Sequence, residues 1–183
     1  MSVGIAFKDG DRFVVGVDSR MASDECYRDS YKERPKGIKL KNGIVLACSG
    51  NIALLDLFAK KFETFDKLDR ETILYKAVIP FMRDYNGFCF MENDNALDGS
   101  LIVAMNDKCF LINSIGTVEE VYKYNAIGSG KMTALGSLYS TCFSNTDAEA
   151  KVALAIKAAG ANVPSVSSEA WVADTKGLEF TLM

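Results

Sequence analysis

Two periods of hydrophobic and polar positions alternate along the chain, and they predict where strands and helices lie. Before residue 51, short apolar runs rich in β-branched residues alternate with polar turns, which is typical of β-hairpins. The Asn42-Gly43 pair is the strongest of these turn signals. The polar segment 19–35 lacks a clear period and is expected to form a long loop or an irregular edge. Strands are expected at residues 2–7, 13–18, 37–40 and 44–48.

After this point the apolar residues recur at spacings of three and four, which predicts amphipathic helices. The first helix is expected over residues 54–65, and Asp69 is the expected N-cap of the second. Pro80 lies inside the second helical pattern and is expected to kink or shorten that helix. Two more helices are expected, one opened by the turn at residues 128–130 and one capped by Asp147. The remaining strands are expected at residues 100–105, 109–115, 118–124, 170–174 and 178–182, with a loop at 87–98.

The order of these elements is strands, two helices, strands, two helices, strands. Runs of antiparallel strands between paired helices predict an α+β fold, namely a four-layer αββα sandwich of two antiparallel sheets flanked by helices. The chain has 183 residues, of which 49% are hydrophobic, and this suits one sizeable core. No repeat, low-complexity segment or linker interrupts it, so residues 1–183 are expected to form a single domain.

The composition argues against nucleic-acid binding and against a membrane-spanning segment. The net charge of −3 provides no basic field for nucleic acid. No apolar run approaches the roughly 18 residues of a membrane span. The five cysteines form no Cys-x-x-Cys pair, and the chain begins without a signal-peptide pattern, so we expect reduced thiols in a cytoplasmic protein.

The chain contains no histidine. This excludes Ser-His-Asp and Cys-His triads, His-Glu-x-x-His metalloproteases and nearly all catalytic zinc sites. We expect no metal ion and no cofactor. A hydrolase of this composition needs a general base of another kind.

Four segments, in this order and at compatible spacing, resemble the proteasome β-subunit family and its bacterial relative HslV. They are residues 3–10 (VGIAFKDG), residues 14–20 (VVGVDSR), Lys36 followed by residues 42–50 (NGIVLACSG), and residues 126–139 (AIGSGKMTALGSLY). In that family the catalytic N-terminal residue lies sixteen positions before an aspartate, and Asp18 lies sixteen positions after Ser2. The resemblance implies the fold of the N-terminal-nucleophile (Ntn) hydrolases.

The resemblance also implies a peptidase or amide hydrolase whose nucleophile is Ser2 once Met1 has been removed, as cells usually do before a small residue. A serine hydroxyl needs a base, and a free α-amino group, with a reference pKa of about 7.7–8.0, can serve near neutral pH. Lys36 would keep that amine neutral and Asp18 would hold Lys36 in place. The backbone N–H of Gly50 would stabilise an oxyanion, and Ser129 would orient the amine.

Two departures from the family pattern leave alternatives open. Two extra residues lie between Asp18 and Lys36, so Lys32 and Lys39 compete with Lys36 for the lysine role. The family's Asp-x-x-Ser-Gly-Gly pattern before the closing strand is replaced here, and Asn162 stands at the aspartate position.

Because of the second departure, the alternative is a non-catalytic proteasome-fold subunit with a structural or assembly role. A third interpretation is a small-molecule site around residues 128–130. The resemblance implies a polypeptide substrate and a homo-oligomeric ring, and it leaves an unfoldase partner possible.

Overall fold

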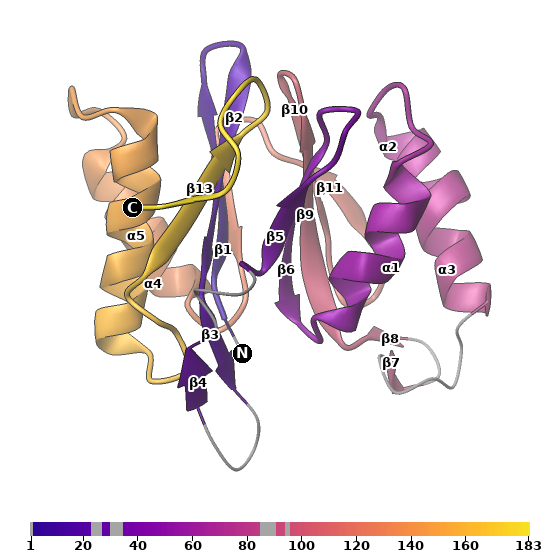
Figure 1. The fold of residues 1–183 in the computed structure, drawn as a ribbon, viewed down its shortest axis with the longest axis horizontal. Coiled ribbons are helices and arrows are strands. Elements are labelled where there is room, and N and C mark those ends of the chain that lie inside the picture. Colours follow the sequence, from indigo (N-terminus) through magenta and orange to yellow (C-terminus); the bar gives the residue numbers. More distant parts are fainter. Residues whose placement is uncertain (1, 23–26, 30–34, 85–90, 94–95) are drawn as a thin grey trace.

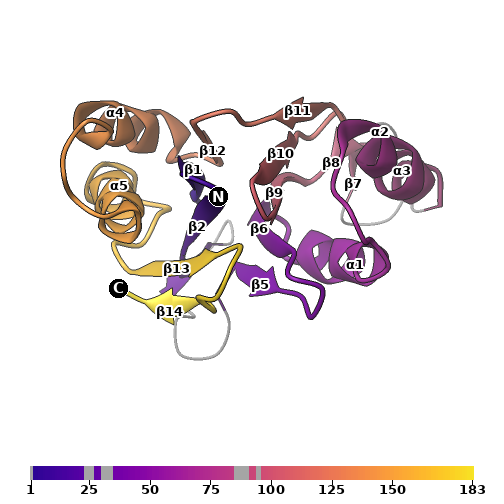
Figure 2. The same cartoon turned by 90° about the horizontal axis from the view of Figure 1, so that it is seen from above.

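Two five-stranded antiparallel sheets are stacked face to face, with helices on both outer faces (Figure 1). The computed structural model describes residues 2–22, 27–29, 35–84, 91–93 and 96–183. The predicted four-layer αββα architecture is therefore confirmed, and Figure 2 shows the four layers from above.

The first sheet has the strand order β12-β1-β2-β13-β14. Its strands are β1 (Gly4–Asp9), β2 (Arg12–Asp18), β12 (Tyr124–Ile127), β13 (Ala170–Asp174) and β14 (Thr181–Leu182). It is covered by α4 (Lys131–Thr141) and α5 (Ala148–Asn162). The helix α5 approaches β2 closely because Gly16 has no side chain, and a Cβ there would lie 2.3 Å from Val152 Cγ1.

The second sheet has the order β11-β10-β9-β6-β5. Its strands are β5 (Gly37–Lys39), β6 (Val45–Gly50), β9 (Gly99–Met105), β10 (Lys108–Ile112) and β11 (Val118–Glu120). The helical segments on its outer face are α1 (Ala53–Phe62), α2 (Arg70–Thr72), the π-helix η1 (Ile73–Val78) and α3 (Ile79–Asp84). Two short hairpins complete the fold, β3 (Arg20–Ala22) with β4 (Tyr27–Asp29), and β7 (Met91–Asn93) with β8 (Ala96–Leu97).

Buried apolar side chains form three layers, one between the sheets and one beneath each helical layer. The central strands are buried on both faces, which explains why their sequences are nearly continuous apolar runs. The two predicted N-caps are confirmed, since Asp69 accepts the N–H of Thr72 at 2.7 Å and Asp147 accepts that of Ala150 at 2.7 Å.

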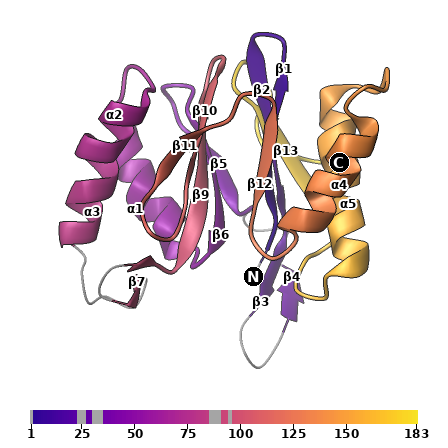
Figure 3. The same cartoon turned by 180° about the vertical axis from the view of Figure 1, so that it is seen from behind.

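The structure corrects three of the predicted elements, namely the strand at 118–124 and the loops at 19–35 and 87–98. Residues 118–124 are not one strand, because β11 ends at Glu120 and a separate strand, β12, joins the other sheet beside β1 (Figure 3). At Pro80, where a kinked or shortened helix was predicted, helical residues continue to Asp84, and the π-helical turn η1 precedes Pro80 with the N–H of Ile79 bonded to Leu74 O. The segments 19–35 and 87–98 contain the two short hairpins, although part of each lies outside the described residues.

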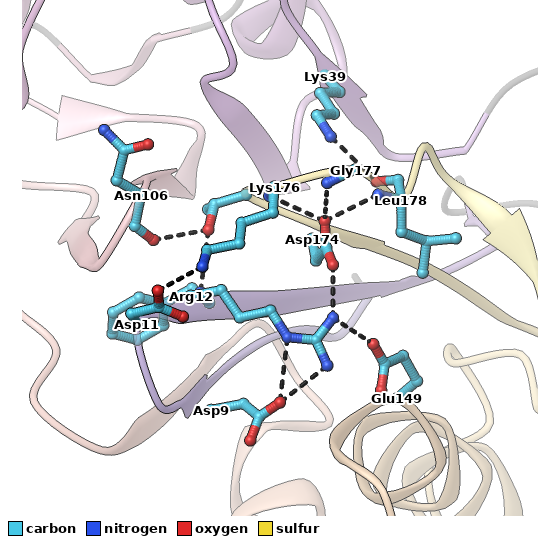
Figure 4. A network of polar contacts seen from close by, with 12 residues as sticks. Asp9, Asp11, Arg12, Lys39, Asn106, Glu149, Asp174, Lys176, Gly177 and Leu178 are labelled. Atoms are coloured by element: carbon cyan, nitrogen blue, oxygen red, sulfur yellow. Dashed lines mark hydrogen bonds and ion pairs between the residues drawn. The ribbon is translucent and has the colours of Figure 1, made fainter.

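A polar network closes the end of the first sheet that carries the β1–β2 turn (Figure 4). The Arg12 guanidinium pairs with Asp9 at 2.8 Å, with Glu149 of α5 at 2.7 Å and with Asp174 of β13. Asp174 also accepts the backbone N–H of Leu178 at 2.8 Å. Burial acts to raise the pKa of Asp174. Hydrogen bonds from the backbone N–H groups of residues 176–178 and from Arg12 outweigh burial and lower that pKa. Arg12 thus connects the β1–β2 hairpin to the helix α5 and to the strand β13.

Candidate active site

The hairpin register brings the start of β1 next to the end of β2, at the opposite end of the sheet from the Arg12 network. Gly4 pairs with Val17, so the neighbouring residue Val3 faces Asp18. The N–H of Val3 donates to Asp18 Oδ1 at 3.0 Å, and the N–H of Asp18 donates to Val3 O at 3.2 Å. The predicted closeness of Ser2 and Asp18 thus follows from an ordinary antiparallel hairpin.

Lys36 is the lysine that reaches Asp18, with its Nζ 3.1 Å from both carboxylate oxygens. The ion pair is buried, because Asp18 is 0% and Lys36 6% exposed. Burial lowers the pKa of Lys36 below its ordinary value, and the charge of Asp18 only partly opposes this. Lys39 instead donates to Leu178 O, and Lys32 lies outside the described residues.

The Asp18 carboxylate is saturated with donors. In addition to Val3 and Lys36, it accepts the backbone N–H of Arg20 and of Ser167, each at 3.2 Å to Oδ2. A carboxylate that accepts this many N–H groups is held in one position.

Ser129 contacts the backbone of Ser2 rather than its side chain. Its hydroxyl donates to Ser2 O at 3.4 Å, and the N–H of Gly130 donates to the same oxygen at 3.3 Å. Ser129 Oγ also lies 3.1 Å from Ser165 Oγ. The sequence analysis did not select Ser165, although it occupies the serine position of the altered Asp-x-x-Ser-Gly-Gly segment.

The hydroxyl of Ser2 forms no hydrogen bond with the described residues. Ser2 is 1% exposed, yet its Oγ has no hydrogen-bond partner among the described residues. A buried hydroxyl without a partner costs about 1–3 kcal/mol, so such groups are rare unless they serve another purpose.

Gly50 ends β6 with a φ of 94°, which favours glycine. Its neighbour Ser49 approaches the Ser2–Gly128 contact, since Ser49 Cβ lies 3.1 Å from the position of a Cβ on Gly128. No hydrogen bond joins Gly50 to Ser2 within the described ranges. Asp18 therefore contacts Lys36 and the backbone of Val3, and Ser129 contacts the backbone of Ser2. Gly50 itself makes no such contact, and only its neighbour Ser49 approaches this cluster.

Asn162 takes no part in this cluster. Its side chain is exposed and donates to Ala158 O at 2.8 Å, one turn back in α5. The described residues contain no group of His, Cys, Asp and Glu side chains that could hold a metal ion. In the same part of the chain, no helix has the length and apolar character needed to cross a membrane.

A cavity of about 150 Å³ adjoins this cluster at Gly128. Its lining includes Ser100, Asn113, Glu119, Gly128 and Lys131.

Gly128 is the position where a small change should disturb the cluster most directly. Its φ is 87°, and an added Cβ would lie 2.1 Å from Ser2 O, closer than such atoms approach. We expect Gly128→Ala to displace Ser2 and to lower the melting temperature, as measured by thermal denaturation. The matched control is Gly136→Ala in α4, where an added Cβ meets nothing within 4 Å. Equal loss in both variants would contradict this account of Gly128.

Comparison with known proteins shows what the chain is similar to. The family model described as proteasome subunit matches residues 1–169. Among solved structures, BPH of Thiobacillus denitrificans is 19% identical with a TM-score of 0.79, covering 98% of each chain. Its complex with epoxomicin is also 19% identical, with a TM-score of 0.78 and coverage of 98% of this chain and 99% of that one.

Eukaryotic HslV from Trypanosoma brucei is 19% identical with a TM-score of 0.73, covering 94% of this chain and 98% of that one. No curated protein sequence matches the chain. At this level of identity the solved structures show a shared fold.

Proposed function

The chain belongs to the proteasome subunit family, and from this premise we propose that it is a peptidase or amide hydrolase with Ser2 as its nucleophile. Removal of Met1 leaves Ser2 with a free α-amine, which serves as the base. The observation that carries the proposal is the buried Asp18–Lys36 ion pair, bonded to the backbone of Val3 beside the uncommitted Ser2 hydroxyl. This pair supports the proposal because Asp18 binds both the Lys36 ammonium and the N–H of Val3, the residue after Ser2.

In the proposed reaction the α-amine accepts the proton of Ser2 Oγ, and Oγ attacks the carbonyl carbon of the substrate. The N–H of Gly50 donates to the resulting oxyanion. The ammonium then gives its proton to the leaving amine, which departs as the C–N bond breaks and an ester to Ser2 remains. A water molecule, deprotonated by the same amine, hydrolyses this ester and restores the hydroxyl.

Lys36 and Ser129 would support this chemistry in different ways. The positive charge of Lys36 disfavours protonation of a neighbouring amine and so keeps the base available near neutral pH. Ser129, held by Ser165, fixes the carbonyl of Ser2 and thereby the direction of the terminal amine. The cavity beside Gly128 offers room for part of a polypeptide substrate.

We further propose a cytoplasmic homo-oligomeric ring, as in the family, with an unfoldase as a possible partner. The second candidate function is a non-catalytic subunit that uses the fold for assembly. One observation favours it, namely that Asn162 replaces the family's aspartate and turns away from the cluster.

The state of the N-terminus separates the two functions. We expect the intact mass of the native protein to lack Met1 and this protein to hydrolyse a fluorogenic peptide. The matched control carries one extra glycine before Ser2, which keeps the hydroxyl but moves the amine, and it should be inactive. Equal turnover by the two proteins, or native protein that retains Met1, would reject the proposed mechanism.

A further inference from the structure

Ser19, Ser167 and Glu169 form a ring of hydrogen bonds next to Asp18 in the chain. Ser167 belongs to the segment where the family's Asp-x-x-Ser-Gly-Gly pattern is missing. Ser19 Oγ donates to Glu169 Oε2 at 3.0 Å, and Ser19 Oγ and Ser167 Oγ are 3.0 Å apart. The N–H of Glu169 donates to Ser167 Oγ at 2.9 Å, which closes the ring. Both serines are buried, at 0% and 2% exposure.

The Glu169 carboxylate sets the direction of every bond in this ring. An ionised carboxylate only accepts hydrogen bonds, so Ser19 must donate to it. Ser19 Oγ then accepts from Ser167, whose own oxygen accepts from the Glu169 backbone. The hydroxyls of Ser19 and Ser167 thus each donate one hydrogen bond and accept one. The bond from Ser19 to the Glu169 carboxylate is the strongest of the three, because its acceptor is charged.

The ring is joined to the candidate active site through Asp18. Ser19 follows Asp18 in the chain, and the N–H of Ser167 donates to Asp18 Oδ2 at 3.2 Å. Fixing Ser167 against Ser19 therefore fixes one of the donors that hold the partner of Lys36.

A second connection runs through Arg20. Its guanidinium donates to the carbonyl oxygens of Pro164, at 2.7 Å, and Val166, at 3.3 Å. These residues flank Ser165, which contacts Ser129. The segment 164–169, which carries Ser167 and Glu169, therefore also contacts the Ser129 hydroxyl that bonds to Ser2 O.

We propose that Glu169 is a positioning residue for the Ser2 site, acting through Ser19 and Ser167 on Asp18. Its carboxylate bonds to Ser19, the residue after Asp18, and Ser167 stands at a position where the family pattern has glycine. The inference rests on the proposed function of Ser2.

The test compares Glu169→Ala, Glu169→Gln and the matched control Glu179→Ala, an exposed residue of the segment before β14. Glutamine keeps an oxygen that accepts from Ser19, whereas alanine removes it. We expect Glu169→Ala to lower kcat by about 10- to 100-fold, the size of effect that a small misplacement of reacting groups causes, with little change in KM. Glu169→Gln should recover most of that loss, and Glu179→Ala should behave as the wild type.

Wild-type kcat in Glu169→Ala would overturn the inference and leave the proposed function intact. A fall in kcat that only follows the loss of folded protein in thermal denaturation, without rescue by Glu169→Gln, would also overturn it. Absence of peptide hydrolysis by Met-free wild type, or full activity of Ser2→Ala, would instead remove the proposed function and the inference with it.

Discussion

Ser2→Ala is expected to lower kcat by a factor on the order of 10⁴ to 10⁶ without reducing the stability of the fold. The hydroxyl is the proposed nucleophile, so its removal eliminates covalent catalysis. Because Ser2 Oγ is buried and has no partner among the described residues, its loss breaks no hydrogen bond and relieves an unsatisfied polar group. Peptide hydrolysis and the free energy of unfolding, measured on the same preparation, check both halves of this prediction.

Two variants sharpen the test. Ser2→Thr retains both a hydroxyl and an α-amine and should retain measurable turnover. Ser140→Ala removes an exposed helix hydroxyl that donates to Gly136 O and should leave turnover unchanged. Turnover by Ser2→Ala at the wild-type rate would show that another group is the nucleophile.

Lys36→Met is expected to destabilise the protein by about 3–5 kcal/mol, because removing one partner leaves the buried charge of Asp18 uncompensated. Methionine keeps the length and most of the apolar volume, so packing changes little. The same variant should lose turnover, since no fixed cation then opposes protonation of the terminal amine. Urea denaturation and peptide hydrolysis measure the two effects.

This variant also has a pH signature with a definite sign. Burial lowers the pKa of Lys36 from its ordinary 10.5, so between the lowered value and 10.5 the unfolded chain binds more protons than the folded one. The contribution of Lys36 to the free energy of unfolding must therefore rise with pH across that window. Burial raises the pKa of Cys48 to about 12, and the charge of Lys36 partly opposes this. Cys48 therefore contributes a slope of the opposite sign, and this slope is steeper in Lys36→Met, which adds to the difference between the two proteins.

The difference in unfolding free energy between wild type and Lys36→Met should accordingly increase with pH within the window. The matched control is Lys39→Met, in a lysine that bonds only to the Leu178 carbonyl among the described residues. A small, pH-independent loss of stability in Lys36→Met would contradict the buried-pair account.

The closeness of Ser2 and Asp18 could be predicted from the sequence because a hairpin is local. Two apolar runs and one turn fix the register, and register alone brings the two residues together. The choice of Lys36 over Lys39 could not be made locally. It depends on β5 pairing with β6 and on the stacking of one sheet on the other, which decide which lysine is buried.

Other features depend on contacts between distant segments and left no local pattern. Ser19 and Ser167 are 148 positions apart, and the ring that they form with Glu169 exists only in the folded chain. The start of β12 was included in the predicted strand 118–124 because Val118, Val121 and Tyr124, which all favour strands, lie on both sides of the break. Pro80 predicted a kinked or shortened helix, and the structure has a π-helical turn over Ile73–Val78, shortly before the proline.

Whether the oxygen of Ser2 attacks an electrophile with the help of its own amine can be measured directly. Native protein is incubated with a β-lactone probe, and the site of attachment is located by peptide mass mapping. The account predicts one adduct, on the hydroxyl of an N-terminal Ser2 in chains that lack Met1, and no adduct when glycine precedes Ser2. Unmodified Ser2 in Met-free protein, or equal labelling of the glycine-extended chain, would contradict it.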